Sequence, residues 1–236
     1  MIRQDYLMRL LDQLAQALAR VLSLRENEAR GQALDFLNRE SERLIGIDGA
    51  MLEILSPDAI QKATASVEKS FVAARILEEI SLISEEEGDR HRATAAAVKA
   101  FWLYAAAAQS DASAADNTFR ERIAGFGDAC AERGLDAADL RSLMAGYEML
   151  GEFGRAEDAL FALVEVAGNA DDALPVGRGF YARLAEHEDA ELEKGGLPRN
   201  ELQDGVDGFL ARVQSRMSRK EIPDETGEAD GAANSA

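Results

Sequence analysis

The sequence predicts an all-α protein, and three observations support this prediction. Alanine, leucine, glutamate and arginine are abundant, and these are the strongest helix formers. Apolar residues recur every three or four positions, with no run of the alternating pattern that is typical of strands. The prolines stand only at positions 57, 175, 198 and 223, so long stretches contain no helix breaker. About ten helices joined by short turns are expected.

The first predicted helix covers residues 2–24 and is amphipathic. Its apolar side is a row of residues spaced three or four apart: Ile2, Tyr6, Leu10, Leu14, Leu18 and Val21. Polar residues, among them Asp12 and Arg20, occupy the opposite side. Such a wide apolar row needs a partner surface. Either the rest of the chain covers it, or residues 2–24 form a homodimer or dock to another protein.

The next predicted helices lie at 26–45, 67–87 and 89–109. Two glycines interrupt the pattern within 46–57, and Ser56 with Pro57 is typical of a helix start, with serine as the N-cap and proline at the first helical position. The 67–87 helix is followed by Gly88, a residue that suits a helix C-terminus.

The second half of the sequence predicts five further helices. We place them at 115–133, 136–150, 152–168, 177–193 and 199–217, with a polar linker over 110–116. The last residues are acidic and lack core side chains. The predicted organisation is an N-terminal helical region (1–66), a helical-hairpin body (67–218) and a disordered acidic tail (219–236).

Composition narrows the possible compartments and partners. The net charge of −18 would repel a phosphate backbone, so we expect no nucleic-acid partner. A single cysteine, Cys130, excludes a disulfide within the chain. Asp5, Arg9 and Asp12 interrupt any signal-peptide core, and no run of 18 apolar residues occurs. We therefore expect a cytoplasmic protein without membrane insertion.

One stretch carries a recognisable spacing of large and small residues. Its positions are Leu140, Leu143, Tyr147, Gly151, Phe153, Ala156, Leu160 and Leu163. This stretch resembles the tetratricopeptide repeat, a helix-turn-helix unit with large residues on the first helix and small ones on the second. A weaker match to the same frame consists of Leu77, Ile80, Gly88, Ala93, Ala97 and Ala100. The resemblance implies stacked antiparallel hairpins in an α-solenoid, with Ala93 and Ala156 wedged between helices.

A broader resemblance covers most of the chain. The segments DYLMRLLDQLAQALARVL, GEFGRAEDALFALVE and FYARLAEHEDAELEKGGLPRNEL occur in this order. Together they are similar to an uncharacterised bacterial family with a tetratricopeptide-like body, a domain of unknown function. That family has no established activity to transfer to this chain.

The sequence offers little catalytic chemistry. The two histidines, His91 and His187, lie far apart, and only Glu191 stands at a chelating spacing from His187. Phosphate-binding loop, hydrolase and zinc-protease motifs are absent. We therefore expect a non-enzymatic protein without a cofactor or metal.

The tetratricopeptide resemblance implies a peptide-binding inner face. Transferring its positions gives, for the stronger unit, Ala138, Arg141, Ser142, Ala145 and Glu148. The weaker unit gives Arg75, Glu78, Glu79, Leu82 and Glu85. Only Arg75 and Arg141 among these are cations, so we expect a mixed or basic peptide rather than a C-terminal carboxylate. The alternatives are self-assembly through the first helix, and a small-molecule binder or enzyme in the concave groove.

Overall fold

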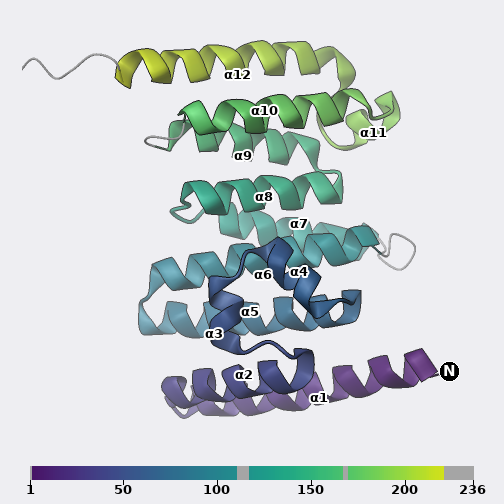
Figure 1. Ribbon diagram of the computed structural model, residues 1–236, viewed down its shortest axis with the longest axis vertical. Coiled ribbons are helices and arrows are strands. Elements are labelled where there is room, and N and C mark those ends of the chain that lie inside the picture. The colour runs from purple at the N-terminus through teal and green to yellow at the C-terminus, as the bar shows by residue number, and fades with distance from the viewer. Residues whose placement is uncertain (1, 111–116, 167–169, 221–236) are drawn as a thin grey trace, which may run out of the picture.

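The protein is a layered stack of helices. The computed structural model describes residues 2–110, 117–166 and 170–220, which form twelve helices and no strand. Figure 1 shows most helices lying across the long axis, from α1 and α2 at one end to α12 at the other. The all-helical prediction is confirmed.

The helices follow the chain from one end of the stack to the other. Their bounds are α1 Ile2–Glu26, α2 Arg30–Ile45, α3 Gly49–Ile54, α4 Pro57–Thr64, α5 Val67–Glu87, α6 Arg90–Ser110, α7 Asn117–Ala131, α8 Ala137–Leu150, α9 Phe153–Glu165, α10 Ala170–Ala185, α11 Asp189–Lys194 and α12 Arg199–Lys220.

The longer helices pack as pairs, and each pair packs on the next. The main pairs are α1 with α2, α5 with α6, α8 with α9, and α10 with α12. Successive pairs meet where α2 contacts α5, α6 contacts α8, and α9 contacts α10. The short α3 and α4 cross the front of the stack between its lower layers, and α7 contacts both α6 and α8.

Local sequence explains where several helices begin and end. Ser56 caps α4, where its Oγ accepts a hydrogen bond from the Ala59 N–H, and Pro57 is the first helical residue as predicted. Gly88 and Gly151 end α5 and α8 with φ angles of 81° and 77°. These left-handed conformations suit glycine, which has no Cβ to clash with the backbone.

Small residues let the central helices approach closely. Ala93 and Ala156 have 0% exposure, so their predicted burial is confirmed. The ring of Phe101 on α6 lies between Gly127 of α7 and Gly146 of α8, where added methyl groups would meet ring atoms at 2.6 and 2.4 Å. One continuous core extends from Leu10 to Val213, across the predicted boundary at residue 66.

The helix boundaries depart from prediction in three places. The stretch 46–57, read as a break, contains α3, which Asp48 caps through a hydrogen bond from the Ala50 N–H. Pro175 lies inside α10, which begins at Ala170; as the sixth residue it removes one backbone donor near the helix start without ending the helix. The predicted 177–193 helix is two helices, because Glu188 starts α11 with a reciprocal capping interaction to Glu191.

Two predicted segments lie largely outside the described residues. They are the 110–116 linker, of which only residue 110 is described, and the acidic tail, which is described only to residue 220.

Candidate functional site

A groove crosses three layers of the stack at α6, α8 and α10. It encloses about 660 Å³ and is lined by Trp102, Gln109, Ala145, Glu148, Met149, Arg183, Glu186 and His187. Trp102 and Gln109 come from α6, the next three residues from α8, and Arg183 from α10. Glu186 and His187 follow the C-terminus of α10.

The groove lining combines an apolar surface with an ion pair. Trp102, Ala145 and Met149 are half-buried, so each presents part of its side chain to the groove. The Arg183 guanidinium donates to both carboxylate oxygens of Glu148, with Nε to Oε1 at 2.5 Å and Nη2 to Oε2 at 2.8 Å. This bidentate geometry fixes the orientation of both side chains and raises the pKa of Arg183 through the Glu148 hydrogen bond.

His187, which also lines the groove, is held by contacts with neighbouring side chains. Its Nδ1 lies 3.0 Å from the Glu191 carboxylate, and its ring packs 4.8 Å from the ring of Phe153. The Arg199 guanidinium donates to the backbone carbonyls of Ala185, at 3.0 Å, and His187. Arg199 therefore supplies hydrogen-bond donors to backbone carbonyls that have no helical partner at the end of α10.

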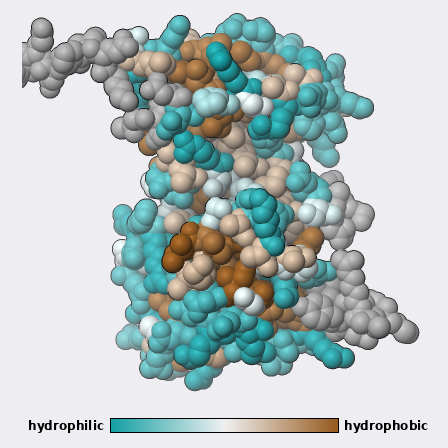
Figure 2. All heavy atoms as spheres, in the orientation of Figure 1, coloured by the Kyte–Doolittle hydropathy of each residue, from teal (hydrophilic) through white to brown (hydrophobic). Residues whose placement is uncertain are grey.

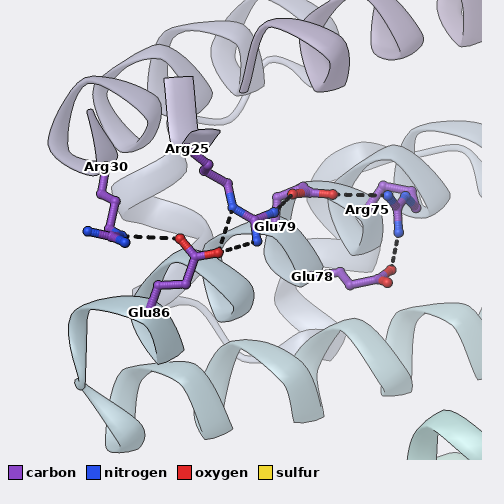
Figure 3. Close-up of polar contacts among 6 residues, drawn as sticks. All are labelled: Arg25, Arg30, Arg75, Glu78, Glu79 and Glu86. Carbon is purple, nitrogen blue, oxygen red and sulfur yellow. Dashed lines mark hydrogen bonds and ion pairs between the residues drawn. The ribbon is translucent and has the colours of Figure 1, made fainter. Parts of the chain in front are cut away.

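Three of the residues predicted to bind a partner belong to a network of ion pairs within the chain. Figure 3 shows Arg75 in contact with both Glu78 and Glu79 of α5, and Glu79 also in contact with Arg25 at the end of α1. Arg75 pairs with Glu78 and, through Nη2 at 3.1 Å, with Glu79. The Arg25 Nη1 lies 3.0 Å from the other Glu79 oxygen.

The network extends to the last turn of α5. Glu86 receives hydrogen bonds from Arg25, with Nη2 at 2.5 Å, and pairs with Arg30 of α2 at 3.2 Å. The Arg25 hydrogen bond lowers the pKa of Glu86 and raises the pKa of Arg25. On the other side, the Tyr104 hydroxyl of α6 donates to Glu78 at 2.6 Å. These charges therefore tie α1, α2, α5 and α6 together.

Comparison with known proteins places the chain in a family without an assigned role. Residues 1–214 match DUF6483, a family of unknown function. The chain belongs to this family. No curated protein and no solved structure matches it. The activity of this DUF6483 protein must therefore be argued from its own residues.

Some of the remaining predicted residues line the groove, and the others lie elsewhere on α8 or on α5. Ala145 and Glu148 line the groove. Arg141, in the same helix, has its Nη2 3.9 Å from Asp172, and Ser142 donates to the Ala138 carbonyl at 3.0 Å. On α5, Leu82 is 40% exposed. Neighbouring Glu85 pairs with Arg133 at 3.5 Å.

Apart from Ala145 and Glu148, the groove residues were not predicted from the sequence: Trp102, Gln109, Met149, Arg183, Glu186 and His187. Their separation along the chain conceals that they meet, because α6, α8 and α10 become neighbours only through packing. Local signals exist within single helices: on α6 Trp102 and Gln109 are seven residues apart, and on α8 Met149 follows Ala145 by four, so each pair shares a face.

A second exposed feature of the DUF6483 protein is an apolar patch on α3. Met51 and Ile54 are 44% and 75% exposed. Figure 2 shows apolar side chains at the surface where Figure 1 places α3 and α4. Glu53 joins α3 to α6: its carboxylate pairs with Arg92 at 2.6 Å, and its carbonyl accepts a hydrogen bond from the Lys99 ammonium.

Buried titratable groups in this DUF6483 chain offer little reactivity. Burial raises the pKa of the Cys130 thiol to about 12, so it stays protonated near neutral pH. Burial also lowers the pKa of Lys99 and raises that of Asp139. No described helix has the length and apolar character needed to cross a membrane.

Proposed function

We propose that this protein is a tetratricopeptide-like interaction module that binds a segment of a protein partner in the α6–α8–α10 groove. The observation that carries the proposal is the composition of the groove, whose lining combines apolar Trp102, Ala145 and Met149 with polar and charged side chains. Such a surface suits a peptide or helix that buries an apolar anchor and keeps polar flanks.

The ion pair in the groove indicates which side chains of a partner would contribute most to binding. Glu148 is paired with Arg183, so its charge is largely neutralised before any partner arrives. An apolar anchor against Trp102 therefore contributes more to the proposed binding than a basic side chain against Glu148.

The α3 patch extends the proposed docking surface. Lys99, which holds α3, precedes Trp102 by three residues and lies on the same half-buried row of α6. A partner segment running along α6 would meet Ile54 at one end and the groove at the other.

Site-specific photo-crosslinking tests this proposal. A photoreactive residue at Gln109, which lines the groove, should capture a defined protein in cells of the source organism. The same residue at Asp35, an exposed position on α2, should not. Equal capture at both positions would contradict the groove as the docking site.

A matched pair of substitutions tests the groove independently. Ala145→Arg places a charged side chain among the apolar residues of the groove and should abolish capture of the crosslinked partner. Ala211→Arg makes the same change at an exposed position of α12 and should leave capture intact. Circular dichroism of both variants checks that each remains folded.

A further inference from the structure

A second cavity lies where α7 and α9 both pack on α8, and it encloses about 170 Å³. Figure 1 shows α7 and α9 on either side of α8 along the stack. The lining of this α7–α9 cavity comes from all three helices and from Leu135, which precedes α8. Apolar side chains form most of it, and three charged side chains complete it.

The α7–α9 cavity is separate from the groove of the proposed function. No residue of the described chain lines both. On α8, Leu143 and Tyr147 line the cavity, whereas Ala145 and Met149 line the groove. At about 100° per residue, positions two apart face nearly opposite sides of a helix. A ligand in the cavity would therefore not compete with a partner in the groove.

The size of the cavity suits one ring-sized apolar group. Its walls include three alanines, Ala131 of α7 and Ala159 and Ala162 of α9, where longer side chains would reach into the space. Leu140 and Leu143 are buried and add apolar surface from α8. An apolar protein cavity of about 150 Å³ holds one benzene molecule. A single ring or a branched alkyl group therefore fits here, whereas the groove, at about 660 Å³, has room for a longer segment.

Three charged side chains line the cavity, and two of them already have partners. Asp128 Oδ1 accepts a hydrogen bond from the Tyr147 hydroxyl at 2.9 Å, and its Oδ2 lies 3.2 Å from Arg155 Nη2. Arg155 Nη1 also donates to Glu152 at 2.9 Å. The third, Asp158, is exposed, and no cation in the described part of the chain pairs with it. The charge that remains for a ligand is therefore negative.

We propose that the α7–α9 cavity binds a small organic amine. Its ammonium group pairs with the Asp158 carboxylate, and an apolar body of about one ring lies against Leu140 and the three alanines. The ammonium gains a charge-assisted hydrogen bond, and the ring gains by leaving water. An anionic ligand finds no free cation, because Arg155 is engaged by Asp128 and Glu152. The net charge of −18 also draws cations to the surface of this chain.

Three probes that share a ring and differ in charge test the proposal: 2-phenylethylamine, 2-phenylethanol and phenylacetate. Each is titrated into the full chain at pH 7 and followed by the NMR shifts of its backbone amides. The amine should shift the amides around Ala159 and Ala162 and saturate with a Kd on the order of 1 mM, as expected for about nine heavy atoms in an open cavity. The alcohol should bind about threefold more weakly, the scale of one exposed ion pair, and phenylacetate should not saturate. Equal affinities for the amine and the alcohol, or shifts confined to other helices, overturn the proposal.

A charge substitution tests the role of Asp158. Asp158→Asn should weaken amine binding by about threefold and leave the affinity for the alcohol unchanged. The matched control Asp35→Asn, at an exposed position of α2, should change neither affinity. An Asp158→Asn variant that still prefers the amine over the alcohol contradicts the proposal.

A filling substitution tests the location of the apolar body. Ala162→Leu occupies the cavity and should abolish binding of both the amine and the alcohol. Ala211→Leu makes the same change at an exposed position of α12 and should bind both probes as the wild type does. Circular dichroism checks that each variant is folded. Amine binding that survives Ala162→Leu places the ligand elsewhere and overturns the proposal. Because none of the substituted residues lines the groove, these results do not depend on peptide binding there.

Discussion

Individual side chains in this protein show how closely its helices approach. Phe101 is fully buried, and glycines face its ring from two neighbouring helices. Three tyrosines in turn hydrogen-bond to carboxylates on neighbouring helices: Tyr104 to Glu78, Tyr147 to Asp128 and Tyr181 to Glu157. Burial raises the pKa of each of these tyrosines, so each remains a donor near neutral pH.

Gly146→Ala should destabilise the fold by about 1–3 kcal/mol, the usual cost of overpacking a core. The new Cβ would lie 2.4 Å from Phe101 Cε1, and Gly127 on the other side leaves the ring no space to move. Denaturant unfolding measures the loss. As a control, Gly125→Ala on α7 meets no atom within 4 Å and should gain about 0.5–1 kcal/mol from higher helix propensity. An equal gain at Gly146 would show that the ring is free to shift.

Glu157→Gln should raise the Tm at pH 7 by a few degrees at most. Burial raises the pKa of Glu157 in the folded state, so its ionised form costs stability there. Glutamine keeps the acceptor for the Tyr181 hydroxyl without the charge. The gain in Tm should be absent below about pH 4, where this glutamate is protonated in both the folded and the unfolded chain. It should appear as pH rises through the folded-state pKa of Glu157. Thermal melts across pH measure it, with the exposed Glu121→Gln as a control that should show no such trend.

Helices of the stack are joined by charges as well as by apolar packing. Arg25 lies where α1 ends and contacts two carboxylates of α5, while Arg30 at the start of α2 contacts one of them. Glu79 also pairs with Arg75, so one carboxylate bridges two arginines. The first hairpin is therefore oriented on α5 by partly buried ion pairs.

Arg25→Ala should cost about 1–2 kcal/mol, because it leaves Glu79 and Glu86 each with fewer partners in a partly buried position. Its side chain is 16% exposed. The matched control Arg43→Ala removes an exposed pair with Glu40 of the same helix and should cost less than about 0.5 kcal/mol.

The pH dependence of the Arg25 variant follows from Glu86. The pKa of Glu86 is lowered in the folded state, so its stabilisation is present above the unfolded pKa, about 4.3, and is lost as pH falls through the folded pKa. The difference between wild type and Arg25→Ala should therefore shrink in acid. A difference that grew in acid would contradict the ion-pair explanation.

Across the full stack, each layer depends mainly on its neighbours. α6 is the most enclosed part, because it contacts α5, α7 and α8 and most of its side chains are buried. The end helices α1 and α12 have neighbours on one side only within the described chain. Stability in such an arrangement is a sum of layer and interface contributions, so the ends open more easily than the centre.

Hydrogen exchange should reveal this gradient. Amides of α6 and α8 should exchange most slowly, and those of α1 and α12 fastest, because local opening at an end breaks fewer contacts. Uniform protection along the chain would show that the stack opens only as a unit.

Much of the helical architecture was predictable because its determinants are local. Ser56 with Pro57, and glycines 88 and 151, mark helix ends through backbone preferences that act within a few residues. The resemblance to the tetratricopeptide frame implied the burial of Ala93 and Ala156, and both are fully buried. The extra helix α3 was missed because its cap is a single Asp48 in a glycine-containing stretch that reads as a turn.

Sequence alone determined the helical class, the main hairpins and the family, since helix propensity, capping and apolar period depend on neighbours along the chain. Tertiary structure decided which charged residues are accessible. Arg75, Glu78 and Glu79 had the pattern of a binding surface, yet Arg25, some 50 residues earlier, contacts this cluster through Glu79. Trp102 and Arg183 looked unrelated, yet both line the groove. Packing between helices that are distant in sequence decides both the ion pairs of the α5 cluster and the lining of the groove. A side chain can pair with a distant residue, or line a groove with it, only after their helices have packed together.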